Sequence, residues 1–133
     1  MKNFTLIALF AFFLSNDVFA QETFEMKEGD TTFVMQKYFM CFLSKGDASG
    51  YDSTQLATIQ ADHLAHLNQM AEDGKISVAG PFGDDQNIRG IVIFNVATME
   101  EAIKLQSEDP AVKAGVLEIE IRPWWAAKGS VLK

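Results

Sequence analysis

The residue best suited to chemistry in this chain is His63, which falls on the apolar side of a predicted helix. On a helix turning about 100° per residue, four apolar side chains lie within about 40° of it. They are Leu56, Ile59, Leu67 and Met70. An imidazole among such residues is costly unless it is hydrogen-bonded or used in a reaction. His63 is therefore either an acid or base facing a pocket or a core histidine with a buried partner.

A second candidate is Asp109, which precedes Pro110 and is followed by Gly115. An Asp N-cap, a Pro at the first helical position and a Gly after the last are typical of one short helical turn. A carboxylate fixed in this way could also hold the imidazole of His63 in one tautomer. The two roles are compatible because a carboxylate has two oxygens. The sequence leaves open whether the His63–Asp109 pair forms.

Four further residues are candidates for substrate binding. Gly80 and Pro81 follow a predicted short strand, where their backbone could line the mouth of a pocket or simply form a turn. Arg122 and Trp124 share one face of the last predicted strand, opposite its apolar residues. An arginine there could hold an anionic substrate group, and interface packing explains both side chains equally well.

Other residues of chemical interest give weaker signals. His66 lies about 60° from His63 around the helix and is expected to face solvent or a helix–sheet rim. Asp62, His63 and His66 could suggest metal ligands, but no second cluster of ligands accompanies them in the sequence, so no metal site is predicted. Cys41, the single cysteine, lies in an apolar strand and is predicted to be a buried packing thiol.

Six elements are predicted along the chain: strands at 31–44, 76–79, 89–96 and 116–124, and helices at 53–73 and 99–107. Ser53 and Thr98 are the predicted N-caps, and Gly74 ends the first helix. The resulting βαββαβ order is the split βαβ of ferredoxin-like folds. The sequence therefore predicts an α+β fold.

The hydrophobic pattern of the strands predicts their order in the sheet. The first and third strands are apolar on both faces, so they are expected to be central. The fourth alternates apolar and charged side chains, as an edge strand does. We expect an antiparallel sheet in order 4-1-3-2, counting these four strands along the chain, with two helices on one face. A second copy of the sheet is the simplest cover for the other face, so a homodimer is expected.

The first twenty residues read as a signal peptide. Lys2 precedes an apolar run from Phe4 to Leu14, and Val18-Phe19-Ala20 has the spacing of a signal peptidase site. Cleavage after Ala20 predicts export, to a periplasm or to the outside, with retention as an anchor left open. No second apolar stretch follows, so no stable membrane span is expected after cleavage. The polar stretch at 21–34 is predicted to be a flexible lead-in to one domain at 35–133.

Composition narrows the range of partners. The chain has 11 basic and 18 acidic residues, a formal net charge of −7, and no cluster of Lys or Arg. This balance argues against nucleic acid or an anionic membrane as partner. The chain also has no glycine-rich phosphate loop, no nucleophile elbow and no His-x-x-x-His zinc motif. No cofactor is therefore expected.

Four pieces of the chain, taken in order, resemble the YCII-related (YciI-like) family of small dimeric α+β proteins. They are the His63-Leu-x-x-Leu67 helix closed by Gly74, a strand ending Ala79-Gly80-Pro81, the segment Asp109-Pro110-x-Val112-x-Ala114-Gly115, and a last strand ending Arg122-Pro123-Trp124. The resemblance covers about residues 35–125. It implies a dimeric α+β barrel and a catalytic role for His63.

Two functions are consistent with these residues. The first is a small cofactor-free enzyme in which His63, oriented by Asp109, moves a proton on a small organic molecule, in a lyase, dehydrohalogenase-like or isomerase step. The resemblance implies this class. The second is a non-catalytic dimeric module that binds a ligand in the same pocket, with the His63–Asp109 pair as a structural link.

Overall fold

The computed structural model describes residues 20–133, and the predicted signal peptide lies outside them except for Ala20. The elements are β1 (Thr23–Glu28), β2 (Thr31–Lys45), α1 (Ser53–Glu72), β3 (Ile76–Pro81), β4 (Ile88–Phe94), α2 (Met99–Ser107), α3 (Pro110–Lys113) and β5 (Leu117–Ala127). Along these residues, no helix is both long enough and apolar enough to cross a membrane.

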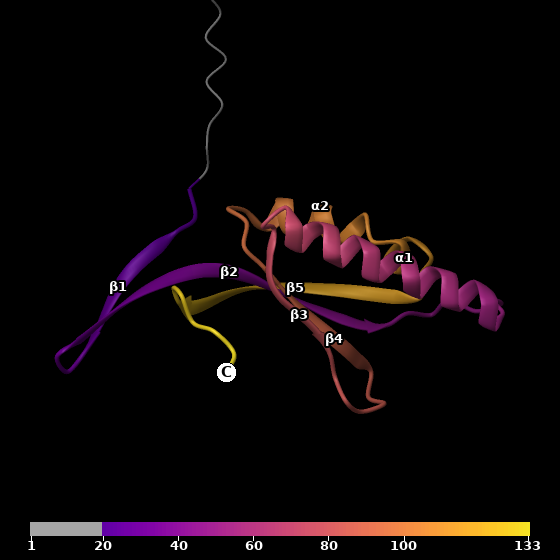
Figure 1. Ribbon diagram of the computed structural model, residues 1–133, viewed down its shortest axis with the longest axis horizontal. Helices are drawn as coiled ribbons and strands as arrows, with labels where there is room; N and C mark the ends of the chain where they lie inside the picture. The colour runs from indigo at the N-terminus through magenta and orange to yellow at the C-terminus, as the bar shows by residue number, and fades with distance from the viewer. Residues whose placement is uncertain (1–19) are drawn as a thin grey trace, which may run out of the picture.

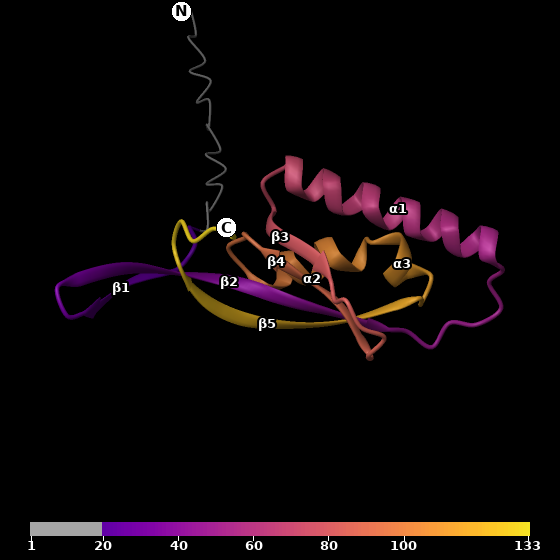
Figure 2. The same cartoon turned by 60° about the horizontal axis from the view of Figure 1, so that its bottom comes forward.

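The sheet is built around β2, the longest strand. One edge of β2 pairs antiparallel with β5 along Met35–Lys45, and the other pairs antiparallel with β4 along Phe39–Ser44. Strand β3 then pairs with β4. Without β1, the order β5-β2-β4-β3 is the predicted 4-1-3-2, so the α+β class and this strand order are confirmed. Helices α1, α2 and the short α3 all lie on one face of the sheet (Figure 2).

The N-terminal segment departs from the prediction of a flexible lead-in at 21–34. Strand β1 pairs with β2 from Thr23 to Glu28, and β2 begins at Thr31. Gly29-Asp30 joins the two strands, with Gly29 at φ 59°, at the position where two-residue hairpin turns favour glycine. The hairpin projects away from the helices (Figures 1 and 2). Apolar and polar side chains alternate within Thr-Phe-Glu-Met-Lys-Glu, as in a strand, but most of the residues in this stretch are polar, so the sequence suggested a loop.

The helices begin close to their predicted starts. Asp52, and not Ser53, caps α1: its side chain accepts a hydrogen bond from the Gln55 backbone, and the Gln55 side chain accepts one from the Asp52 backbone. Thr98 caps α2 as predicted. The Asp-Pro segment forms α3 as predicted, with Asp109 as N-cap.

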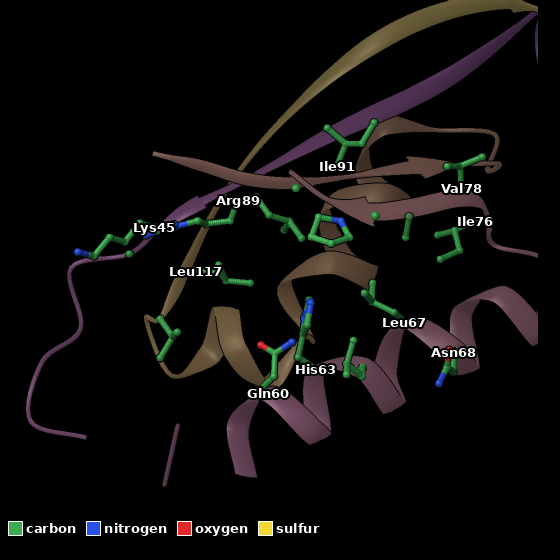
Figure 3. A pocket seen from close by; sticks show the side chains of 18 of the residues that line it. Lys45, Gln60, His63, Leu67, Asn68, Ile76, Val78, Arg89, Ile91 and Leu117 are labelled. Carbon is green, nitrogen blue, oxygen red and sulfur yellow. The ribbon is translucent and has the colours of Figure 1, made fainter. Parts of the chain in front are cut away.

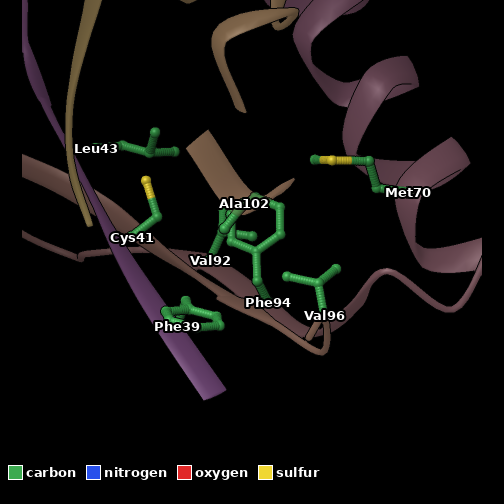
Figure 4. Close-up of a cluster of buried hydrophobic side chains, with 8 residues drawn as sticks. All are labelled: Phe39, Cys41, Leu43, Met70, Val92, Phe94, Val96 and Ala102. Carbon is green, nitrogen blue, oxygen red and sulfur yellow. The ribbon is translucent and has the colours of Figure 1, made fainter. Parts of the chain in front are cut away.

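The core lies between the sheet and the helices (Figure 4). Its buried apolar members are Phe39, Cys41, Leu43, Met70, Val92, Phe94, Val96 and Ala102. Cys41 is fully buried, as predicted. Burial, with a smaller effect from the charge of Asp109, raises the pKa of its thiol from 9.0 to about 12. The thiol is therefore neutral at physiological pH and is not a nucleophile.

We expect Cys41 to be unreactive in the native protein. At pH 8 a thiol-specific disulfide reagent should leave folded protein unmodified and should label one thiol per chain after denaturation in urea. Since the pKa is raised in the folded state, the associated stability is present below about pH 9 and is lost as pH rises toward about 12. Native labelling as fast as that of the unfolded chain would contradict this expectation.

Candidate active site

His63 and Asp109 meet in the interior of the domain, although 46 residues separate them. Nδ1 of His63 lies 2.7 Å from Oδ2 of Asp109. His63 is 6% exposed and Asp109 is 0% exposed, so the pair is shielded from bulk water. Helix α1 carries the histidine, and the turn that starts α3 carries the carboxylate. The structure thus forms the pair that the sequence left open.

Three donors fix the Asp109 carboxylate. Oδ2 accepts hydrogen bonds from His63 and from Nε2 of Gln106 at 2.8 Å. Oδ1 accepts one from the Ala111 backbone at 2.9 Å, which is the N-cap bond of α3. A carboxylate only accepts hydrogen bonds, so Nδ1 of His63 carries the proton. In the neutral form of the ring, the lone pair is then on Nε2.

The other nitrogen of His63 is open to a cavity. Nε2 makes no hydrogen bond within residues 20–133, and it is not fully buried. His63 is one of the residues that line the cavity, and Figure 3 places it between the two ends of that space. A neutral imidazole held in this way presents a proton acceptor to whatever occupies the cavity.

The cavity has a volume of about 780 Å³ and lies between α1, β3 and β4, with Val116 and Leu117 closing one side. This volume is within the range typical of small-molecule sites. Most of the wall is apolar, and Leu56, Leu64 and Leu67 of α1 contribute to it. The polar side chains on the wall are Lys45, Gln60, His63, Asn68, Ser77 and Arg89. None of the lining residues is an Asp or Glu.

Gly80 and Pro81 line the cavity, but they belong to β3 and do not form a turn. Gly80 has no positive φ, and a Cβ added to it would meet nothing within 4 Å. Glycine is required instead at Gly90 on the neighbouring strand β4. A Cβ there would be 2.6 Å from the Gly80 carbonyl oxygen. The absence of a side chain at Gly90 therefore lets β3 and β4 pair beside the cavity.

Arg122 and Trp124 do not line this cavity, so within one chain their predicted role in substrate binding is not supported. Ile119 and Ile121 pack against the core on the helix side, and alternation along β5 directs Arg122 and Trp124 to the opposite face. Nε of Arg122 donates to Glu120 at 2.6 Å. The ring of Trp124 lies 6.2 Å from that of Tyr38 on β2.

The second histidine is part of the packing between helices. Nε2 of His66 lies 3.0 Å from the carbonyl oxygen of Leu105 at the end of α2. His66 is therefore half-buried against a helix, rather than at a helix–sheet rim. Across the described range, no group of three or more His, Cys, Asp and Glu side chains is placed to hold a metal ion.

Gln106 is a member of the site that the sequence analysis missed. It is fully buried and donates to Oδ2 of Asp109, whereas the Ala111 backbone donates to Oδ1. Its Oε1 is the one buried side-chain oxygen or nitrogen in residues 20–133 without a hydrogen-bond partner. A signal was present, because Gln106 lies four residues after Ala102 on the inward face of α2. An amide on that face is unexpected unless it binds another buried group.

The chain matches one family model and is similar to a solved structure. The YCII-related domain matches residues 38–125. No curated protein matches the chain. Among solved structures, the chain is similar to 5-chloro-2-hydroxyhydroquinone dehydrochlorinase of Burkholderia phenoliruptrix AC1100, determined in complex with 2,5-dihydroxybenzoquinone. The identity is 23% and the TM-score 0.45, over 65% of this chain and 92% of the other.

Proposed function

The chain belongs to the YCII-related family, and from this premise and the geometry of the cavity we propose that it is a small acid–base enzyme. Its substrate is a small organic molecule, and no cofactor takes part. The observation that carries the proposal is the bond between His63 and Asp109, which leaves Nε2 of His63 facing a cavity with a mainly apolar wall.

In the proposed reaction, Nε2 of His63 takes a proton from a carbon of the substrate as the C–H bond breaks. Asp109 stabilises the imidazolium that forms and keeps its ring in place. The electron pair then either expels a leaving group, which gives an alkene, or shifts so that the proton returns to a neighbouring carbon. These outcomes are a lyase or dehydrohalogenase-like step and an isomerisation. A positioned acid–base group contributes about 10²- to 10⁴-fold to such a rate.

A screen for proton exchange tests the proposal across several substrate classes at once. Purified protein is incubated in D₂O with a panel of β-halo acids, β-hydroxy acids and cyclic enols. Loss of the C–H signal is followed by NMR, with heat-denatured protein as control. The proposal predicts exchange or turnover for one class that depends on His63. If every panel member behaves as it does with denatured protein, the enzymatic proposal fails for these classes.

The apolar wall of the cavity favours a second candidate, a module that binds a hydrophobic ligand without changing it. In that case the His63–Asp109 pair links α1 to α3 and has no chemical role. A ligand that binds and is recovered unchanged, with no proton exchange, would support this alternative.

We also propose that the protein is a homodimer in which a second copy covers the sheet face opposite the helices. Half-buried or buried apolar side chains of β2 and β4 lie on that face: Tyr38, Met40, Phe42, Ile91 and Ile93. Phe42 is directly opposite Ile91, and Met40 is opposite Ile93, so these side chains form one continuous strip. Burial of such a strip against its own copy is the usual solution for a sheet with one uncovered face.

Phe42→Glu is expected to convert the dimer into a monomer, because it places a charge in the centre of the strip. Light scattering after size-exclusion chromatography measures the mass directly. Val131→Glu adds the same charge at a tail position that is 75% exposed, and it should leave the dimer intact. A wild-type protein with the mass of a single chain would contradict the proposal.

A further inference from the structure

One end of the cavity carries positive charge. Lys45 ends β2 and Arg89 lies near the start of β4, and both line the cavity. Their backbones are close, because the amide of Lys45 donates to the carbonyl of Asn87 at 2.8 Å. In Figure 3 both side chains lie at the end of the cavity opposite Ile76 and Val78, with His63 between the two ends.

These two cations are not neutralised by neighbouring carboxylates. Lys45 forms no ion pair within residues 20–133. Arg89 has a single contact of 3.4 Å with Asp85, a side chain that is fully exposed. An exposed pair at that distance is worth little and leaves the guanidinium available. Because the cavity wall has no Asp or Glu, the local charge is positive in a chain whose net charge is −7.

We propose that Lys45 and Arg89 form a subsite for the carboxylate group of the substrate. A guanidinium binds a carboxylate through paired hydrogen bonds, and an ammonium adds a point charge beside it. A molecule anchored at this end extends past His63 along the apolar wall. The substrate class is thus a small carboxylate with an apolar body. The placement of a reacting carbon beside His63 rests on the proposed function, whereas the binding of the anion does not.

The binding test uses benzoate and its neutral analogue benzamide, titrated by isothermal calorimetry or followed by ligand-observed NMR. Benzoate is expected to bind more tightly than benzamide. Arg89→Gln and Lys45→Gln should each weaken benzoate about tenfold or more and leave benzamide unchanged. Arg122→Gln removes the same charge from the opposite face of the sheet and should leave both ligands unaffected. Far-UV circular dichroism checks that every variant is folded.

The outcomes separate this subsite from the proposed reaction. Benzoate binding that depends on Lys45 and Arg89 supports the subsite even if no turnover is found, and it should persist in His63→Asn. Turnover of neutral substrates only, with no benzoate binding, would overturn the subsite and leave the acid–base role of His63 standing. Benzoate affinity that is equal in wild type, Arg89→Gln and Lys45→Gln would also overturn it.

Discussion

His63→Asn is expected to reduce turnover about 10²- to 10⁴-fold while the protein keeps nearly its wild-type stability. The amide nitrogen of asparagine occupies roughly the position of Nδ1 and can still donate to Oδ2 of Asp109. The buried carboxylate thus keeps its partner, and only the free Nε2 is lost. The measurements are kcat on a substrate found by the exchange screen and the midpoint of thermal unfolding.

His63→Ala is the matched comparison. It removes the same base but also removes a donor from a carboxylate that is 0% exposed. The loss of one of the three hydrogen bonds to this buried carboxylate costs about 1–3 kcal/mol, so this variant should lose both turnover and stability. If His63→Asn keeps wild-type turnover, His63 is not the catalytic base. If both variants lose only stability, its role is structural.

Asp109→Asn is expected to lower kcat by up to about 10⁴-fold because it favours the wrong tautomer of His63. The single amide oxygen should remain with the Ala111 N–H, since this bond caps α3. The NH₂ group then faces Nδ1 of His63 and donates to it. The ring proton moves to Nε2, where it blocks the acceptor that the reaction needs.

Two measurements on Asp109→Asn check this explanation. Kinetics should show the loss in kcat with a smaller change in KM, because the substrate does not touch Asp109. The ¹⁵N shifts of the imidazole should report a proton on Nε2 in the variant. Full activity in Asp109→Asn, or an unchanged tautomer, would remove Asp109 from the mechanism.

The parts of the fold that follow from local patterns could be predicted from the sequence. Strand order followed from the two-sided apolar pattern of β2 and β4 and the alternation in β5, because burial of each face depends on position in the sheet. The N-terminal hairpin was missed because part of its packing is long-range. The ring of Phe24 packs edge-on against Trp125 at 4.9 Å, a contact that no local pattern predicts.

Only part of the candidate site could be predicted from local sequence patterns. His63 and Asp109 could be found because each breaks or completes a helical pattern. Lys45 and Arg89 lie in unrelated segments, and the pairing of β2 with β4 brings them together, so neither has a sequence signal. Arg122 and Trp124 were correctly placed on one face of the last strand. That face is the one turned away from the cavity of the same chain.

The proposed mechanism requires that Asp109 hold His63 with its proton on Nδ1 and its lone pair on Nε2, facing the cavity. Long-range ¹H–¹⁵N correlation NMR of the ¹⁵N-labelled wild-type protein at neutral pH measures this arrangement. We expect a protonated Nδ1 and an unprotonated Nε2 for His63, with His66 assigned by its substitution. A proton on Nε2 of His63, or rapid exchange between the two tautomers, would contradict the mechanism.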